Sequence, residues 1–352
     1  MKCDTNRKPS QEDAALCTRR HSDWLSHVSL TREGRGEGAM SGAREVTVID
    51  GGLATELEGA GLQLQDDPLW SARILHTNPQ AIKNVHARYL CSGADVITTA
   101  TYQASLVGFV KYLDLSSEEA VLLLQSGVQL AKEAVGDFLS TSKSSERTPI
   151  IAGSIGPYGA FMHDGSEYTG NYVERMSKEE LKAWHQPQME ALVTAGVDLI
   201  AMETIPSQKE GEALVELLRE FPSTKAWLSF SCKDQQCVSH GEKFEDAVKV
   251  ATKSEQLVAI GLNCCAPDIV SSLLTAANKN TELNTGWIVY PNSGEGWDPN
   301  SGWKGKTMNK KLSSFALEWK ELGTKWFGGC CRTTPADISE LKDMLKPKSL
   351  YE

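Results

Sequence analysis

Two pairs of adjacent cysteines, Cys264-Cys265 and Cys330-Cys331, carry the side chains best suited to chemistry in this chain. Each pair follows a short apolar run and has glycines beside it. Thiolates are soft ligands and favour zinc over calcium or magnesium. Three protein ligands leave one tetrahedral position open, as in catalytic zinc sites. The pattern therefore predicts a Zn²⁺ cofactor whose open position accepts a substrate thiol.

The pattern alone does not decide whether Cys264 or Cys265 joins the other pair at the metal. Neighbours on a strand point to opposite faces, so Cys330 and Cys331 can share a metal only where the strand becomes a loop. The preceding Gly328-Gly329 gives the backbone that freedom. Two alternatives are that these cysteines are small buried hydrophobic residues, or that Cys330 and Cys331 form a disulfide. Adjacent cysteines form a disulfide only with strain.

Two acidic residues also follow or end apolar runs. Asp50 precedes Gly51-Gly52, and Glu203 emerges from the run 199–202. A carboxylate in such a place is costly to bury without a partner. We expect Asp50 and Glu203 to hold an ammonium group, and the backbone N–H groups of Gly51 and Gly52 to bind a carboxylate. A simple turn at the end of a strand is the alternative for Asp50.

Short apolar runs alternate with amphipathic stretches from residue 46 onward. Eight runs are expected strands: 46–50, 96–99, 150–153, 199–202, 226–230, 259–262, 287–290 and 325–327. The expected helices are 79–91, 117–138, 178–195, 208–220, 244–253, 268–279 and 308–322. Strands that alternate with helices pair in parallel through right-handed crossovers. Eight such units in about 300 residues predict an α/β fold, a single (β/α)₈ TIM barrel.

The barrel also predicts where the functional residues meet. Its active site forms at the carboxyl ends of the strands, and the cysteines, Asp50 and Glu203 all fall at or just beyond such ends. The expected strands before the two cysteine pairs are the sixth and the eighth, which line one mouth. A doubly wound open sheet is the alternative, although it would normally have fewer strands.

Composition limits the class of protein. The 352 residues are 40% hydrophobic and 23% charged, which is typical of a globular protein. No run of 18 apolar residues occurs, so we expect no membrane partner. The net charge of −10 argues against a nucleic-acid partner. Nine cysteines without a signal peptide predict free thiols and metal ligands in a cytoplasmic protein.

The first 44 residues differ from the rest. They mix charges of both signs with few apolar runs, so we expect residues 1–44 to be a disordered tail and residues 45–347 to be the barrel domain. The tail carries six acidic residues, at 4, 12, 13, 23, 33 and 37, and these argue against a mitochondrial transit peptide.

The chain resembles the homocysteine S-methyltransferase family over residues 46–345. The resemblance rests on seven segments: Asp50-Gly-Gly-Leu-Ala-Thr-Glu56, Asp67-Pro-Leu-Trp-Ser71, Gly153-Ser-Ile-Gly-Pro157, Met202-Glu-Thr-Ile-Pro206, Gly261-Leu-Asn-Cys264, Tyr290-Pro-Asn-Ser293 and Gly328-Gly-Cys-Cys-Arg-Thr333. Within the family, these segments are most similar to enzymes that use S-methylmethionine or S-adenosylmethionine rather than betaine.

The resemblance assigns roles to these residues. It implies that Cys264, Cys330 and Cys331 bind zinc, with Cys265 as a spare neighbour. It implies that Asp50 and Glu203 contact the homocysteine amino group. Homocysteine's sulfur would take the open zinc position, attack the methyl group of a cationic sulfonium donor, and give methionine.

Two alternative functions stay open at this point. The acceptor could be selenocysteine, or the protein could be a zinc-binding scaffold that has lost catalysis. The presence of Asp50, Glu203 and all three cysteines argues against the scaffold. The sequence does not define the donor or the oligomeric state.

Overall fold

The computed structural model describes residues 46–65, 67–141, 148–281, 285–298, 302–304 and 311–346. Contacts divide the chain between Arg44 and Glu45, and every described residue belongs to the unit that begins at Glu45. The tail expected over residues 1–44 lies outside the described residues, as does residue 347, the expected end of the barrel domain.

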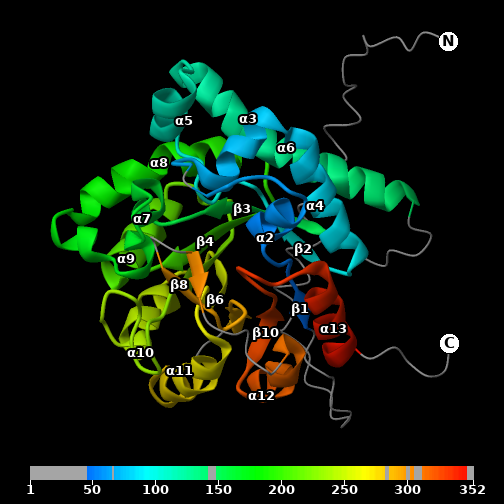
Figure 1. Ribbon diagram of the computed structural model, residues 1–352. Coiled ribbons are helices and arrows are strands. Elements are labelled where there is room, and N and C mark those ends of the chain that lie inside the picture. The colour runs from blue at the N-terminus through cyan, green and yellow to red at the C-terminus, as the bar shows by residue number, and fades with distance from the viewer. Residues whose placement is uncertain are drawn as a thin grey trace. The chain divides into compact units, whose positions relative to one another are not determined.

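Eight parallel strands form a closed barrel, as the sequence predicts (Figure 1). Their order is β1-β10-β7-β6-β5-β4-β3-β2, and a parallel bridge between Ile49 and Val96 joins β1 to β2 and closes the ring. The strands are β1 (Thr47–Val48), β2 (Val96–Thr98), β3 (Ile150–Ile155), β4 (Leu199–Ile205), β5 (Ala226–Phe230), β6 (Leu257–Asn263), β7 (Gly286–Tyr290) and β10 (Thr324–Phe327).

The apolar runs become strands because they are buried on both faces. Every residue of β3, β4, β5, β6 and β7 is buried. In a parallel sheet covered by helices, both faces of a strand lie away from water, so the sequence is apolar without alternation. Polar side chains within these buried strands, such as Ser154, Glu203 and Asn263, therefore need partners inside the protein.

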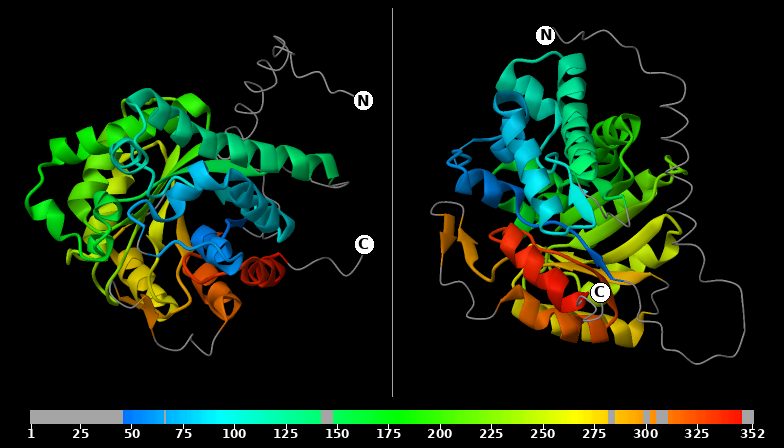
Figure 2. Two further views of the ribbon diagram at one scale, coloured as in Figure 1. Left: turned by 45° about the horizontal axis from the view of Figure 1, so that its top comes forward. Right: turned by 90° about the vertical axis from the view of Figure 1, so that its right-hand side faces the viewer.

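Helices surround the ring of strands (Figures 1 and 2). The main helices are α2 (Leu53–Gly59), α4 (Pro79–Cys91), α5 (Leu106–Leu113), α6 (Ser117–Thr141), α8 (Lys178–Ala195), α9 (Gln208–Leu218), α11 (Pro267–Asn280), α12 (Ala316–Glu321) and α13 (Pro335–Leu345). Shorter ones are α3 (Ile74–Thr77), α7 (Tyr158–Met162) and α10 (Phe244–Ala247), with 3₁₀ segments η1 (Trp70–Arg73), η2 (Ser166–Tyr168), η3 (Asn171–Glu174), η4 (Val248–Lys253) and η5 (Leu312–Phe315).

Capping side chains set the start of α8. Ser177 Oγ accepts a hydrogen bond from Glu180 N at 3.1 Å, and the Glu180 carboxylate accepts from Ser177 N at 2.7 Å. This capping box satisfies two N–H groups that the helix leaves unpaired. It explains why the serine and the acidic residues after it predict the boundary at Lys178 correctly.

Two expected elements differ in detail. The single helix expected over 244–253 is a short α10 followed by the 3₁₀ segment η4. Val248, Val250 and Thr252 lie in η4, and β-branched residues are weaker α-helix formers. The helix expected over 308–322 is η5 followed by α12, and residues 308–310 lie outside the described residues.

One antiparallel strand pair lies outside the barrel. Strands β8 (Gly296–Asp298) and β9 (Gly302–Lys304) pair with each other in the connection between β7 and α12, and Figure 2 shows them apart from the ring. Among the helices that the structure describes, none has the length and apolar composition needed to cross a bilayer.

Candidate metal centre and substrate site

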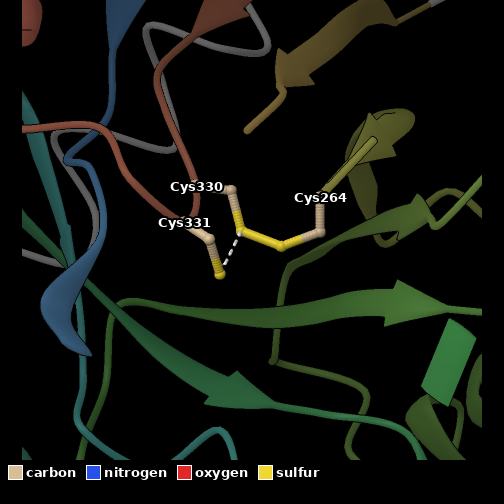
Figure 3. Close-up of side chains that lie close together, drawn as sticks. All are labelled: Cys264, Cys330 and Cys331. Atoms are coloured by element: carbon tan, nitrogen blue, oxygen red, sulfur yellow. Dashed lines mark hydrogen bonds between the residues drawn. A yellow bond between two sulfur atoms is a disulfide. The ribbon is translucent and has the colours of Figure 1, made fainter. Parts of the chain in front are cut away.

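The three predicted cysteine ligands meet at the carboxyl ends of two strands. Cys264 directly follows β6, and Cys330 and Cys331 lie in the loop after β10. Their Sγ atoms all lie within 4.8 Å of one another (Figure 3). Within the described part of the chain, this is the one cluster of three or more potential metal ligands. Cys265 is buried in the hydrophobic core instead, so the structure places Cys264 in the cluster.

A disulfide joins Cys264 to Cys330 in this structure (Figure 3). Our expectation of free thiols is wrong for these two residues, and the disulfide considered from sequence, between Cys330 and Cys331, is not the one formed. Cys331 remains a thiol, with its Sγ 4.0 Å from that of Cys330. The physical reason is that the barrel brings two strand ends, 66 residues apart in sequence, to a common point.

The cluster fits a zinc ion once that disulfide is reduced. Zinc binds thiolates at about 2.3 Å in a tetrahedron, which separates the sulfurs by roughly 3.8 Å. Three sulfurs within 4.8 Å can reach that arrangement through small side-chain movements. Soft sulfur donors without a carboxylate among them also match zinc better than magnesium or calcium.

Close backbone packing fixes the loop that carries Cys330. Its N–H donates to Pro291 O at 2.8 Å, and its carbonyl accepts from Thr333 Oγ1 at 2.6 Å. Gly52 lies against the same carbonyl, since a Cβ there would be 2.7 Å from Cys330 O. Gly329 has a related role, because a Cβ on it would be 2.2 Å from Thr333 Oγ1. Space, rather than a left-handed backbone, therefore requires glycine at both positions.

Asn263 connects the metal cluster to the strand end that carries Glu203. Its Oδ1 accepts from Thr204 N at 2.8 Å and from Ser229 Oγ at 2.9 Å, and its Nδ2 donates to Thr204 Oγ1 at 2.8 Å and to Cys330 Sγ at 4.0 Å. Thr204 and Cys264 both have positive φ, at 60° and 48°. Such strain persists where the surroundings over-determine the backbone, and it is enriched at functional sites.

Asp50 lies buried at the end of β1, 3% exposed. Its Oδ2 accepts from Thr98 N at 2.7 Å, and both carboxylate oxygens accept from Thr98 Oγ1 at 3.1–3.2 Å. Burial raises the pKa of Asp50 to about 8, and the charge of Glu203 adds to this rise, while the Thr98 hydrogen bonds oppose it. Among the described residues no cationic side chain pairs with this carboxylate, so a cationic ligand would stabilise it.

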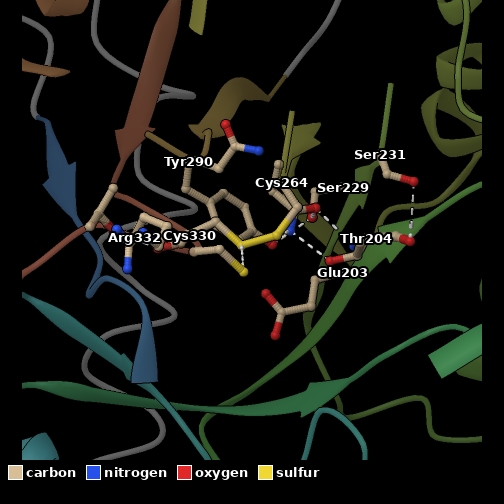
Figure 4. Close-up of a disulfide and its surroundings, with 12 residues drawn as sticks. Glu203, Thr204, Ser229, Ser231, Cys264, Tyr290, Cys330 and Arg332 are labelled. Carbon is tan, nitrogen blue, oxygen red and sulfur yellow. Dashed lines mark hydrogen bonds between the residues drawn. A yellow bond between two sulfur atoms is a disulfide. The ribbon is translucent and has the colours of Figure 1, made fainter. Parts of the chain in front are cut away.

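Glu203 lies in β4, where Figure 4 labels it, is 8% exposed, and acts on Asp50 through its charge. Its carboxylate accepts hydrogen bonds from Ser154 Oγ and Tyr290. Burial raises the pKa of Glu203 to about 7 despite these two bonds. Asp50 and Glu203 therefore form a buried pair of like charges that favours a cationic ligand.

The two glycines after Asp50 differ from expectation in one respect. The N–H of Gly52 already donates to Thr333 O at 3.1 Å, so this group is engaged within the protein. A Cβ on Gly51 would be 2.9 Å from both Tyr89 Oη and Thr333 Oγ1. Close packing is thus the observed role of these glycines, and the use of the Gly51 N–H as a carboxylate donor stays a prediction.

Sequence reasoning missed the residues that support the site. Thr98 and Ser154 orient the two carboxylates. Asn263 links Thr204 and Ser229 to Cys330. Tyr290 also belongs to this group, because its hydroxyl is hydrogen-bonded to Ser229, Trp227 and Glu203. Polar residues inside otherwise apolar strands were the available signal for Ser154 and Asn263.

The fold and site together define a (β/α)₈ enzyme that brings a cysteine cluster and a pair of buried carboxyl groups to one mouth. The profile of the family described as homocysteine S-methyltransferase matches residues 47–345. The chain belongs to the homocysteine S-methyltransferase family, and its reaction is methyl transfer to homocysteine.

Individual members of the family are similar to this chain over most of its length. A Bacillus subtilis homocysteine S-methyltransferase, YbgG, is 44% identical over 84% of this chain and 92% of its own. A Drosophila melanogaster betaine-homocysteine S-methyltransferase is 42% identical over 85% of this chain and 94% of its own. The metallated structure of the Escherichia coli homocysteine methyltransferase MmuM matches with a TM-score of 0.75 at 38% identity, covering 85% of this chain and 96% of that one.

Proposed function

We propose that this protein is a zinc-dependent enzyme that transfers a methyl group from a sulfonium donor, S-methylmethionine or S-adenosylmethionine, to L-homocysteine. The observation that carries the proposal is the cluster of Cys264, Cys330 and Cys331 beside the buried carboxylates of Asp50 and Glu203. Zinc bound there would supply the positive charge that keeps a substrate thiol ionised at neutral pH.

The chain's own residues select and orient the acceptor. Asp50 and Glu203 bind the homocysteine ammonium, which restores their ionised form in a buried site. Thr98 and Ser154 hold the two carboxylates in place. An acceptor fixed at its amino end presents its sulfur toward the cysteines, and this alignment with the donor methyl supplies much of the rate.

The charge balance favours a cationic donor. Two carboxylates and three thiolates surround the mouth, and zinc with one ammonium offsets only part of that charge. As the acceptor sulfur attacks the methyl carbon, the C–S bond of the sulfonium breaks and its electron pair stays on the departing sulfur. Methionine forms, and an S-methylmethionine donor leaves as a second, neutral methionine.

The test offers reduced, zinc-loaded protein homocysteine with S-methylmethionine, S-adenosylmethionine or betaine separately, and repeats each reaction after chelation of zinc. We expect methionine from at least one sulfonium donor, and loss of turnover on chelation that added zinc restores. Turnover with betaine alone would contradict the donor class, and turnover that survives chelation would contradict the zinc role. If homocysteine is not methylated but selenocysteine is methylated under the same conditions, selenocysteine replaces homocysteine as the acceptor.

A further inference from the structure

The 3₁₀ segment η2 (Ser166–Tyr168) lies beside the metal cluster, although its sequence carries no recognisable metal motif. The Tyr168 hydroxyl is hydrogen-bonded to Cys331. The backbone of Glu167 is fixed from both sides: its carbonyl accepts from Ser231 Oγ at 3.3 Å, and a Cβ on Gly159 would be 2.5 Å from its N. The segment is therefore firmly positioned at the mouth of the barrel.

Within the described part of the chain, Glu167 carries a carboxylate oxygen without a hydrogen-bond partner. Its Oε2 is buried and has no hydrogen-bond partner among the described residues. Burial, reinforced by Asp164, raises the pKa of Glu167 to about 7. A buried charged oxygen without a partner is unfavourable, so such groups in native proteins call for a functional explanation.

The charged group that acts on the Glu167 carboxyl is Asp164, which is itself negative. The charge of Glu167 in turn acts on the side chain of Cys331, so the carboxyl lies near the metal cluster. The arginine of the same loop, Arg332, is paired with Glu295 at 2.8 Å. A ligand that satisfies Glu167 should therefore bring its own positive charge.

The acceptor does not bring that charge, because its ammonium binds at Asp50 and Glu203. The second substrate does, since a sulfonium must place its methyl group beside the acceptor sulfur at the cysteine cluster. We propose that Glu167 is the anionic contact for the sulfonium of the methyl donor, flanked by the ring of Tyr168. This inference rests on the proposed function, because it requires a sulfonium donor.

The chemistry predicts a particular kinetic signature. The sulfonium is fully charged in the bound donor and becomes a neutral thioether as the methyl group leaves. A carboxylate beside it therefore stabilises the bound donor at least as much as the transition state. Removing that charge should raise the donor KM without lowering kcat.

The test compares Glu167→Gln with wild-type protein, both reduced and zinc-loaded. We expect the KM for S-methylmethionine to rise about tenfold or more, with the homocysteine KM and the zinc content unchanged. Calorimetric binding of S-methylmethionine should weaken by a similar factor. Glu174→Gln is the matched control, because Glu174 lies in the neighbouring segment η3 with its side chain 73% exposed, and it should leave all these values unchanged.

A sulfonium compound without an amino group tests whether Glu167 contacts the sulfonium or the ammonium of the donor. A dimethylsulfonium carboxylic acid keeps the sulfonium and lacks the ammonium, so Glu167→Gln should weaken its binding by the same factor. Weakening confined to S-methylmethionine would overturn the sulfonium assignment. An unchanged donor KM in an active Glu167→Gln variant would overturn this inference alone, whereas failure of wild-type protein to use any sulfonium donor would overturn the proposed function with it.

Discussion

At the scale of single residues, the site contains buried carboxyl groups whose ionised forms are unfavourable without a cationic ligand. Asp50 and Glu203 are buried carboxylates with raised pKa values, and Glu167 has an oxygen for which no described residue is a hydrogen-bond partner. Each is fixed by neighbours that cannot neutralise it, such as Thr98 and Ser154. The mouth of the barrel is therefore anionic when these groups are ionised, and substrates that carry positive charge neutralise it.

The pH dependence of ligand binding tests the carboxylate pair. The pKa values of Asp50 and Glu203 are raised to about 8 and about 7, so both carboxyls are largely protonated at pH 6 and must lose protons to bind an ammonium. Affinity for methionine, which has the amino acid group but no thiol, should therefore rise between pH 6 and 8, by up to about tenfold per pH unit for each carboxyl that ionises.

Calorimetric titration with methionine across this pH range measures the effect. Asp50→Asn should weaken binding and make the remaining pH dependence shallower, since only Glu203 then ionises. Methionine affinity that is constant from pH 6 to 8 in wild-type protein would contradict the ammonium role of the pair.

At the scale of elements, the loops after β1 and β10 support each other. Gly52 begins α2 as its N-cap and lies against the carbonyl of Cys330, while the N–H of Gly52 donates to Thr333 O. Tyr89 of α4 joins them, with its hydroxyl 3.1 Å from Gly52 O and 3.0 Å from Thr333 O. The metal loop therefore depends on an element nearly 280 residues earlier in the chain.

Substitution of Gly52 tests this dependence. In Gly52→Ala, the added methyl group would lie 2.7 Å from Cys330 O, so the loop must shift. We expect a loss of about 1–3 kcal/mol in unfolding free energy, together with weaker zinc retention. Gly59→Ala on the same helix is the control, because nothing lies within 4 Å of a Cβ there. Denaturant unfolding and metal analysis measure both, and equal behaviour of the two variants would contradict the coupling.

At the scale of the whole molecule, the sequence predicts the strands and long helices of the barrel well. It predicts poorly the short helices and the hydrogen bonds between side chains inside the barrel. The run 226–230 matches β5 residue for residue, because strands that are buried on both faces read as nearly continuous apolar runs. Helices α2, α5 and α13 were not anticipated: α2 follows a glycine pair without a side-chain cap hydrogen bond, and α5 has only 8 residues. Short elements like these take much of their stability from tertiary packing.

The site likewise has some features that the sequence predicts and others that it does not. Cysteines and acids at strand ends were predictable, because the barrel gathers all carboxyl ends at one mouth. The bonds of Asn263 to Thr204, Ser229 and Cys330 depend on neighbouring strands and their register, which no local pattern contains. The disulfide between Cys264 and Cys330 was likewise not predictable from spacing, since it requires the closed ring.

The central claim is that Cys264, Cys330 and Cys331 form one zinc site that the reaction needs. The most direct measurement is the zinc content and methionine formation of reduced wild-type protein and of single Cys→Ser variants at these positions, with Cys265→Ser as the adjacent control. We predict one zinc per chain and full turnover for wild type and Cys265→Ser, and loss of both for the other three. Cys330→Ser protein that retains zinc and turnover would contradict it.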